Sequence, residues 1–138
     1  MTLIATARSI PRTLRQNVEV AGLHHVVTDE PEAVGGDGSA PSPHELLPAA
    51  LAACISTQLV MYARTKHWDI GDVGVHVDYD HRSTPRHFDI EIELGAELTA
   101  EQLERLTTVA EACPVRRALE GGAEFSERLI PAGVVRAA

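Results

Sequence analysis

Two cysteines, Cys54 and Cys113, lie in the two segments of this chain whose residue types could carry out chemistry. Cys54 ends an alanine-rich segment that begins at Ser42, and Cys113 is followed directly by Pro-Val-Arg-Arg. A cysteine reacts as its thiolate, so its surroundings decide whether it is inert or reactive. Two cysteines can be two structural thiols, one structural disulfide or one redox pair. Which of these applies largely decides what the protein does.

Local physics ranks the two thiols differently. The pKa of a thiol falls at a helix N-terminus or beside a cation. Cys113 is expected to cap a short helix and is followed by Arg116 and Arg117, so it should be the more acidic thiol. Cys54 is expected in the middle of a long helix, where it would be an inert, buried side chain. To be catalytic, Cys54 needs a cation from elsewhere in the fold. The candidates are the N-terminal arginines Arg8, Arg12 and Arg15.

The first half of the chain predicts strands followed by a long helix. Short strands are expected over 3–9, 13–20 and 23–29, and then a glycine-rich segment over 29–39 that is either a surface loop or a flap over a pocket. Ser42 and Glu45 form a capping-box pattern, so a helix should begin there and run to about His67. Pro48 predicts a kink in this helix. Its buried face is expected to hold Leu47, Ala50, Leu51, Cys54, Gln58, Met61 and Tyr62.

The second half predicts a hairpin, two helices and a last strand. Residues 70–80 and 86–95 alternate between apolar and polar side chains, as in a hairpin with one buried face. Thr99 should begin a helix whose inner face holds Leu103, Leu106, Val109 and Ala110. A short helix over 114–119 and a strand over 123–130 should follow. This order indicates one α+β domain over residues 1–138, with helices packed on antiparallel sheet.

Composition limits the partners. The chain has 138 residues and a formal net charge of −8, which argues against nucleic acid and against anionic membrane surfaces. Only 4% of its residues are aromatic, so a small chain of this kind would gain from burying surface in an oligomer. We find no secretion leader and no apolar run of about 20 residues, so we expect a cytoplasmic protein. The seven histidines form no zinc-binding pattern, and no metal site is expected.

Two motifs together carry a family resemblance. Residues 42–54 read Ser-Pro-x-Glu-Leu-Leu-x-Ala-Ala-Leu-Ala-Ala-Cys, after Asp-Glu-Pro at 29–31 and Gly-Gly at 35–36, and Cys-Pro-Val follows at 113–115. This combination resembles the OsmC/Ohr family of thiol-dependent peroxidases, nearer to its OsmC-like branch, over nearly the whole chain. The resemblance implies an OsmC-like fold. In that fold, antiparallel sheets wrap around two central helices in an intertwined homodimer.

The resemblance also implies a peroxiredoxin-like reaction in oxidative stress defence. Cys54 would reduce an organic hydroperoxide to an alcohol and become a sulfenic acid, with inorganic hydroperoxides as further candidate substrates. Cys113 would then form a disulfide with Cys54, and an external dithiol would reduce it. No metal or organic cofactor is implied.

Two site positions depart from the family pattern, and a second function is kept open. The family glutamate that orients the arginine lies ten residues before the first cysteine, where this chain has His44, and Glu45 lies nine before it. Glu45 therefore either orients the arginine or only caps the helix. Arg15 is our first choice for the arginine and Arg12 the second.

The alternative function is a non-catalytic dimeric OsmC-like protein that binds a small apolar ligand or a partner.

Overall fold

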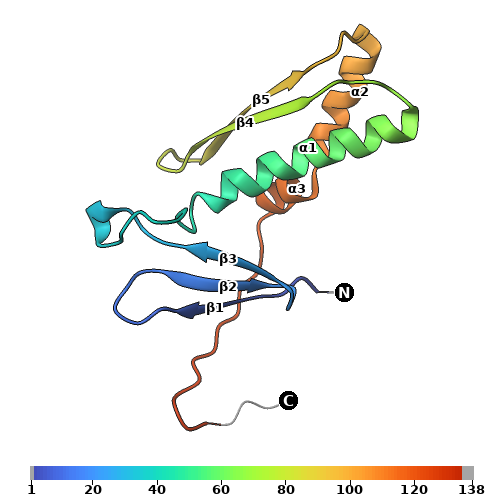
Figure 1. Cartoon of the computed structure of the whole chain (residues 1–138). Coiled ribbons are helices and arrows are strands. Elements are labelled where there is room, and N and C mark those ends of the chain that lie inside the picture. The colour runs from blue at the N-terminus through green and yellow to red at the C-terminus, as the bar shows by residue number, and fades with distance from the viewer. Residues whose placement is uncertain (1, 135–138) are drawn as a thin grey trace.

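The chain forms two small antiparallel sheets and three α-helices over residues 2–134, the part that the computed structural model describes (Figure 1). The order of the elements is β1 (Ala5–Ser9), β2 (Gln16–Val20), β3 (His24–Thr28), the short 3-10 helix η1 (Glu32–Val34), α1 (Leu46–Lys66), β4 (Val73–Asp80), β5 (His87–Leu94), α2 (Ala100–Glu111) and α3 (Pro114–Gly121). The predicted α+β class is confirmed.

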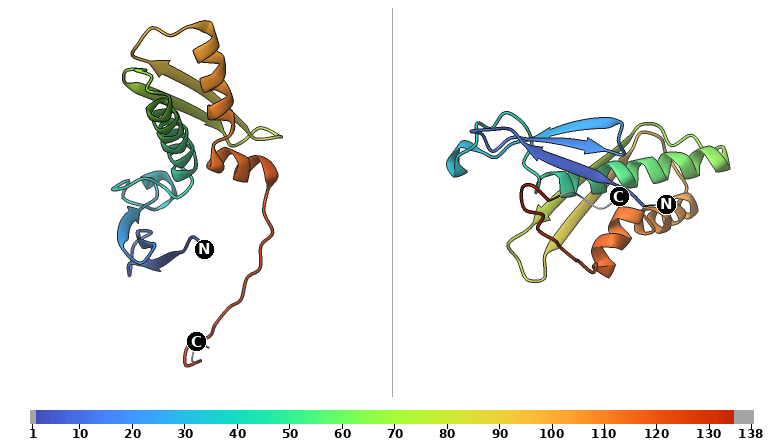
Figure 2. Two further views of the ribbon diagram at one scale, coloured as in Figure 1. Left: turned by 90° about the vertical axis from the view of Figure 1, so that its right-hand side faces the viewer. Right: turned by 90° about the horizontal axis from the view of Figure 1, so that it is seen from below.

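Helix α1 is the centre of the core. It packs against β4, α2 and α3, and its buried side chains follow one another at four-residue spacing (Figure 2). These side chains are Leu51, Ile55, Leu59 and Ala63. Leu106 and Ala110 of α2 and Cys113 join them in one buried cluster. The core therefore lies between α1, the hairpin and the two shorter helices.

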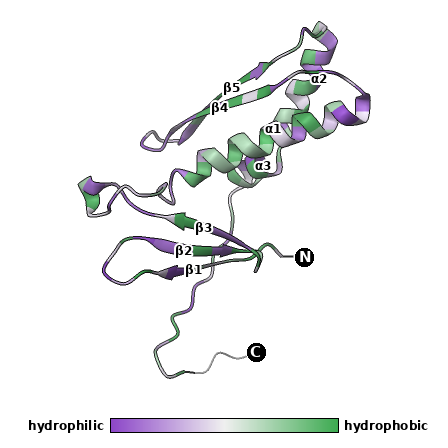
Figure 3. Ribbon diagram, in the orientation of Figure 1, coloured by the Kyte–Doolittle hydropathy of each residue, from purple (hydrophilic) through white to green (hydrophobic). Residues whose placement is uncertain are grey.

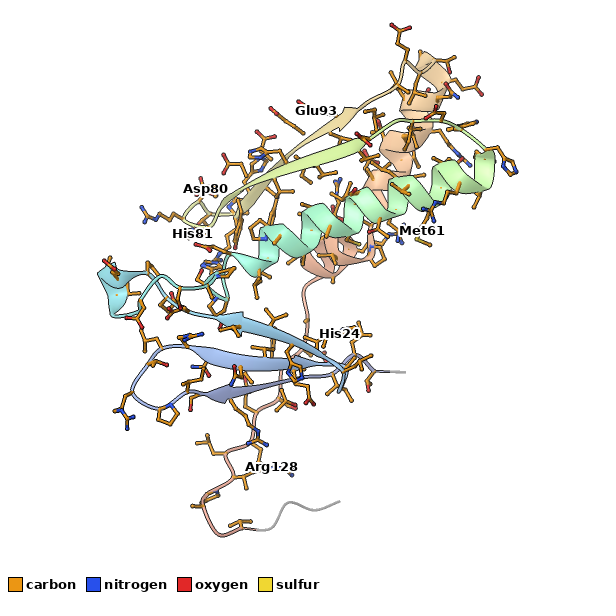
Figure 4. The ribbon with its side chains drawn as sticks, viewed as in Figure 1. His24, Met61, Asp80, His81, Glu93 and Arg128 are labelled. Carbon is orange, nitrogen blue, oxygen red and sulfur yellow. The ribbon has the colours of Figure 1, made fainter. Side chains whose placement is uncertain are left out.

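The predicted buried face of α1 is only partly right. Leu51 is buried and Cys54 half-buried, but Leu47 is 38% exposed and Met61 is 55% exposed. Figure 3 shows apolar residues along most of α1, so periodicity alone could not select the face that the hairpin covers. Met61 points away from the hairpin (Figure 4).

The reciprocal hydrogen bonds of the predicted capping box form in the turn before α1, while Glu45, the N-cap residue of the helix, makes no side-chain capping bond. Ser42 Oγ accepts the backbone N–H of Glu45 at 3.3 Å, and the Glu45 carboxylate accepts the backbone N–H of Ser42 at 3.2 Å. The first helical residue is Leu46, so Pro48 lies in the first turn, where backbone N–H groups lack helical acceptors. The predicted kink is therefore wrong, because Pro48 does not interrupt the helix interior.

The hairpin of β4 and β5 follows its predicted alternation. Val75 pairs with Ile92, Val77 with Ile90, and Tyr79 with Phe88. Val75, Val77, Phe88 and Ile90 pack against the core, whereas Ile92 is 37% exposed. Helix α2 begins with a second reciprocal capping box, formed by Thr99 and Gln102. Leu103 is 46% exposed, however, so its predicted place on the inner face of α2 is wrong.

The sheet of β1, β2 and β3 makes few contacts with the helices. The strands pair in chain order, and every residue of β1 is exposed. A compact loop then leads from β3 to α1. The buried Asp29 carboxylate accepts the Ser39 hydroxyl at 2.7 Å and the backbone N–H groups of Glu30, Asp37 and Ser39. These hydrogen bonds, above all that from the Ser39 side chain, lower the pKa of Asp29 from 3.8 to about 2.

The strand predicted over 123–130 does not form. Within residues 2–134 this segment has no strand partner, and it runs from α3 away from the body (Figure 2). Phe125 is 83% exposed and Leu129 is 97% exposed. An extended segment becomes a strand only when it pairs with the edge of a sheet, and this segment pairs with neither of the two described sheets.

By length and composition alone, α1 is apolar enough to span a membrane. The core helix of a soluble protein passes the same test, and α1 supplies the central stripe of this core. The structure resembles a small soluble domain.

Replacing Leu59 by Ala should lower the free energy of unfolding by about 2–5 kcal/mol, because a buried leucine is lost and a cavity remains. Leu59 is 1% exposed in the centre of α1. Urea unfolding at a fixed protein concentration, followed by circular dichroism, measures the change. The control is Arg64→Ala at an exposed position of α1, for which we expect a change of about 0.5 kcal/mol or less. Equal losses in both variants would contradict the core described above.

Candidate active site

The fold brings Cys54 and Cys113 together. Cys54 lies on α1, half-buried beside the core cluster, and Cys113 is the fully buried N-cap residue of α3. Both are free thiols, and the Cys113 side chain lies close enough to alter the pKa of Cys54. Because α1 and α3 pack against each other, two residues that are far apart in the sequence become neighbours.

Three influences act on the pKa of the Cys54 thiol, two upward and one downward. Burial raises its pKa above the ordinary value for a thiol, and the neighbouring Cys113 side chain raises it further. The backbone N–H of Val115 faces the Cys54 thiol and acts in the opposite direction. The net direction is upward, so the single chain does not by itself make Cys54 a ready thiolate.

The role of Val115 was missed by the sequence analysis, which assigned the start of α3 to Cys113 alone. The side chain of Cys113 makes no capping hydrogen bond, and Pro114 has no backbone N–H to donate. Val115 therefore carries the first free N–H of α3, and this donor serves Cys54. The Pro-Val sequence after Cys113 was the available signal, but only the packing of α3 on α1 shows which thiol benefits.

The predicted arginine is not at Cys54 in the single chain. Among the described residues, no arginine contributes to the pKa of Cys54. Arg15 precedes β2, and its backbone carbonyl accepts the N–H of Ile10 at 3.0 Å in the turn after β1. Its side-chain Nε is buried without a hydrogen-bond partner in the described part of the chain. Arg12 lies in the same turn, and Arg8 lies in β1.

Glu45 and His44 lie at the start of α1 and not beside the thiols. Glu45 exchanges hydrogen bonds with Ser42 in the turn that leads into the helix. The His44 ring makes edge contacts with Tyr79, at 5.5 Å between ring centroids, and with His81, at 4.8 Å. His81 follows β4 at the end of the hairpin near the start of α1 (Figure 4). Glu45 thus stabilises the turn before α1, and an arginine-orienting role for either residue stays a prediction.

A groove of about 660 Å³ lies between α1, the hairpin and α3. Its walls are largely apolar, and three charged side chains, Arg86, Arg116 and Glu120, lie at its surface. Arg116 and Glu120 form an ion pair at 2.7 Å. The groove is lined by Leu51, Tyr79, Arg86, His87, Phe88, Ile90, Arg116, Leu119 and Glu120. Within residues 2–134 there is no group of three or more side chains that could hold a metal ion.

A family model described as "OsmC-like protein" matches residues 36–128, which include both cysteine motifs. The chain belongs to the OsmC-like family. The match extends from the Gly-Gly loop before α1 to the segment after α3, so it contains every element of the thiol site.

Solved structures of the family share this fold. A protein of Psychrobacter arcticus 273-4, provisionally described as an osmotic stress induced and detoxification response protein, is 26% identical with a TM-score of 0.71, over 83% of this chain and 85% of that one. An organic hydroperoxide resistance protein OsmC of Legionella pneumophila is also 26% identical, with a TM-score of 0.61 over 88% and 90% of the two chains. An OsmC-like protein of Mycoplasma pneumoniae is 16% identical, with a TM-score of 0.70 over 88% and 89%, and shows the fold alone. The curated proteins include no significant match to this chain.

Replacing Cys113 by Ala should lower the pKa of Cys54, because it removes one of the two influences that raise it. The rate of Cys54 alkylation by iodoacetamide, followed by peptide mass spectrometry across a pH series, reports this pKa. Alkylation below the pKa should become faster in the variant. Thr108→Ala, at an exposed position of α2, is the control and should leave the profile unchanged. An unchanged or raised pKa in the Cys113 variant would contradict the contact between the two thiols.

Proposed function

We propose that this protein is a thiol-dependent peroxidase that reduces organic hydroperoxides. The observation that carries the proposal is the contact between Cys54 and Cys113 within an OsmC-like fold. The Legionella pneumophila relative, named as an organic hydroperoxide resistance protein, supports the substrate class. We expect the protein to act in oxidative stress defence, with inorganic hydroperoxides as further candidate substrates.

The reaction needs only the two thiols and an external reductant. The Cys54 thiolate attacks one peroxide oxygen, the O–O bond breaks, and the alcohol leaves with a proton, so that Cys54 carries a sulfenic acid. The Cys113 thiol attacks this sulfur, water leaves, and a Cys54–Cys113 disulfide forms. An external dithiol returns both cysteines to thiols and becomes a disulfide itself. No metal or organic cofactor takes part in these steps.

A homodimer would supply what the single chain lacks. Apolar side chains remain exposed on the outer face of α1, at Leu47 and Met61, and on the segment after α3, at Phe125 and Leu129. The sheet of β1, β2 and β3 also remains largely uncovered. Association of two copies would cover these surfaces and bring the N-terminal sheet against the helices. We propose that Arg15, whose Nε lacks a partner here, then lies beside Cys54 and favours its thiolate.

The remaining expectations follow from charge and chemistry. We place the protein in the cytoplasm, where a cysteine pair is more often catalytic than structural. The net charge of −8 disfavours nucleic acid and anionic membrane surfaces as partners. The partners that we propose are a hydroperoxide, a dithiol and a second copy of the chain.

The groove beneath the hairpin favours a second candidate function. Its volume of about 660 Å³ falls in the range of small-molecule sites, and its apolar walls suit an apolar ligand. A non-catalytic OsmC-like dimer that binds such a ligand would keep both thiols without using them. The fate of the thiols separates the two functions, because only the peroxidase converts both of them into a disulfide when it consumes one hydroperoxide.

The two cysteines should have different roles. Cys54→Ser should abolish the consumption of hydroperoxide, because it removes the attacking thiol. Cys113→Ser should complete one turnover and stop at a Cys54 sulfenic acid, which a dimedone probe traps and excess peroxide over-oxidises. Wild type should gain an intrachain disulfide without added oxygen, as mass spectrometry will show. Slow and equal oxidation of both thiols would favour the binding function instead.

Arg15→Ala should slow peroxide reduction by about tenfold or more, because loss of the cation raises the pKa of Cys54. Arg12→Ala and Arg8→Ala, in the same part of the chain, are the matched variants.

The assembly that brings Arg15 to Cys54 should have twice the chain mass in light scattering, and its thermal stability should rise with protein concentration. A stable monomer would rule out the dimer, and equal rates in all three variants would rule out the arginine.

A further inference from the structure

The two sulfurs of the thiol pair differ in access to solvent. The Cys113 side chain is 0% exposed and belongs to the buried cluster, with Leu106 and Ala110 of α2 among its members. Cys54 is half-buried and lies at the edge of that cluster. In the single chain, a molecule that approaches from solvent therefore meets Cys54 before Cys113.

The junction that holds Cys113 is fixed on both sides. The backbone N–H of Cys113 donates to the carbonyl of Ala110 at 3.2 Å, and its carbonyl accepts the N–H of Arg117 at 3.0 Å. These bonds tie the residue to the end of α2 and to the first turn of α3. Exposing its sulfur requires this junction to open, whereas the half-buried Cys54 needs no such opening.

We infer that the external reductant attacks the sulfur of Cys54 and that Cys113 is the thiol released first. This inference rests on the Cys54–Cys113 disulfide of the proposed function. In the step, a bond forms between the reductant sulfur and Sγ of Cys54, and the disulfide bond breaks. Its electron pair goes to Sγ of Cys113, which takes a proton. The second thiol of the reductant then attacks the reductant sulfur of the mixed disulfide and releases Cys54. The reductant loses two electrons and two protons in total, and the protein gains them.

One feature of the site favours attack of the reductant on Cys113 instead. The size of this leaving-group effect must be compared with the effect of solvent access. The N–H of Val115 lowers the pKa of Cys54 and by itself would make Cys54 the better leaving group, although burial and Cys113 raise that pKa on balance. The rate of thiol–disulfide exchange changes about threefold for each unit in the pKa of the attacking thiol. With the same sensitivity for the leaving thiol, a lower pKa of Cys54 would change the rate about threefold per unit. A sulfur without exposed surface cannot be attacked at all until the fold opens. Access therefore outweighs the leaving-group effect.

The test locates the first mixed disulfide. The full-length protein is oxidised with diamide, so that the disulfide does not depend on peroxidase activity, and is then mixed with 2-mercaptoethanol. Acid quenching at early times, digestion with pepsin and mass spectrometry give the position of the adduct. Adducts on Cys54 should exceed those on Cys113 by about tenfold or more, well beyond what leaving groups alone produce. In denaturing urea the two positions should become similar, which shows that both sulfurs can react.

A matched pair of variants tests whether burial is the cause. Leu106→Ala opens a cavity in the cluster that holds Cys113 and should increase the share of Cys113 adducts. Leu103→Ala deletes the same side chain from the exposed face of the same helix and should leave the share unchanged. If the Leu106 variant does not fold, the wild-type ratio remains decisive.

Each outcome separates this inference from the proposed function. Equal adducts in the native protein, or an excess on Cys113, would overturn the inference, as would failure of diamide to join Cys54 to Cys113. A disulfide that opens at Cys54 in a protein that consumes no hydroperoxide would leave the inference standing and remove the peroxidase.

Discussion

The packing of one stripe of α1 against the hairpin and the shorter helices is the interaction on which the rest of the structure depends. Leu51, Ile55 and Leu59 are each 1% exposed, and their burial fixes the rotation of α1 about its axis. Cys54 is next to Ile55 in the sequence, so this rotation places its thiol at the edge of the core. Met61 lies about two turns after Cys54 on the same face of α1, so a helix rotated to bury Met61 would draw Cys54 into the core as well. The hydrophobic contacts and the chemistry of the site are thus set by the same side chains.

The start of α3 adds a second constraint, which acts through the backbone. Because Pro114 has no N–H, the first free donor of the helix is Val115, and it faces Cys54. The single chain gives Cys54 this one favourable contact against the effects of burial and of Cys113. The chemistry that we propose needs a positively charged side chain beside Cys54. The single chain brings the two cysteines together but does not supply this cation.

Local signals in the sequence predicted most of the elements. Ser42 and Glu45 formed the reciprocal hydrogen bonds that their spacing indicated, Thr99 began α2 as predicted, and the alternation in 70–80 and 86–95 gave the hairpin. The strand over 123–130 was wrong because a strand needs an edge to pair with, and sequence pattern does not reveal the edge. The buried face of α1 was partly wrong because the helix is apolar along most of its length. The two cysteines could be selected from their motifs, whereas the N–H of Val115 depends on how α3 packs and has no side-chain signal.

The connectivity of the elements also sets an order of folding. β1, β2 and β3 pair in sequence, β4 pairs with β5, and α1 packs on the strand that follows it. Contacts between neighbours along the chain close short loops and form early. Helix α3 must instead return past α2 to reach α1, across the whole hairpin. We therefore expect the contact between Cys54 and Cys113 to form late in folding, because Cys54 is synthesised well before the residue that is to become its neighbour.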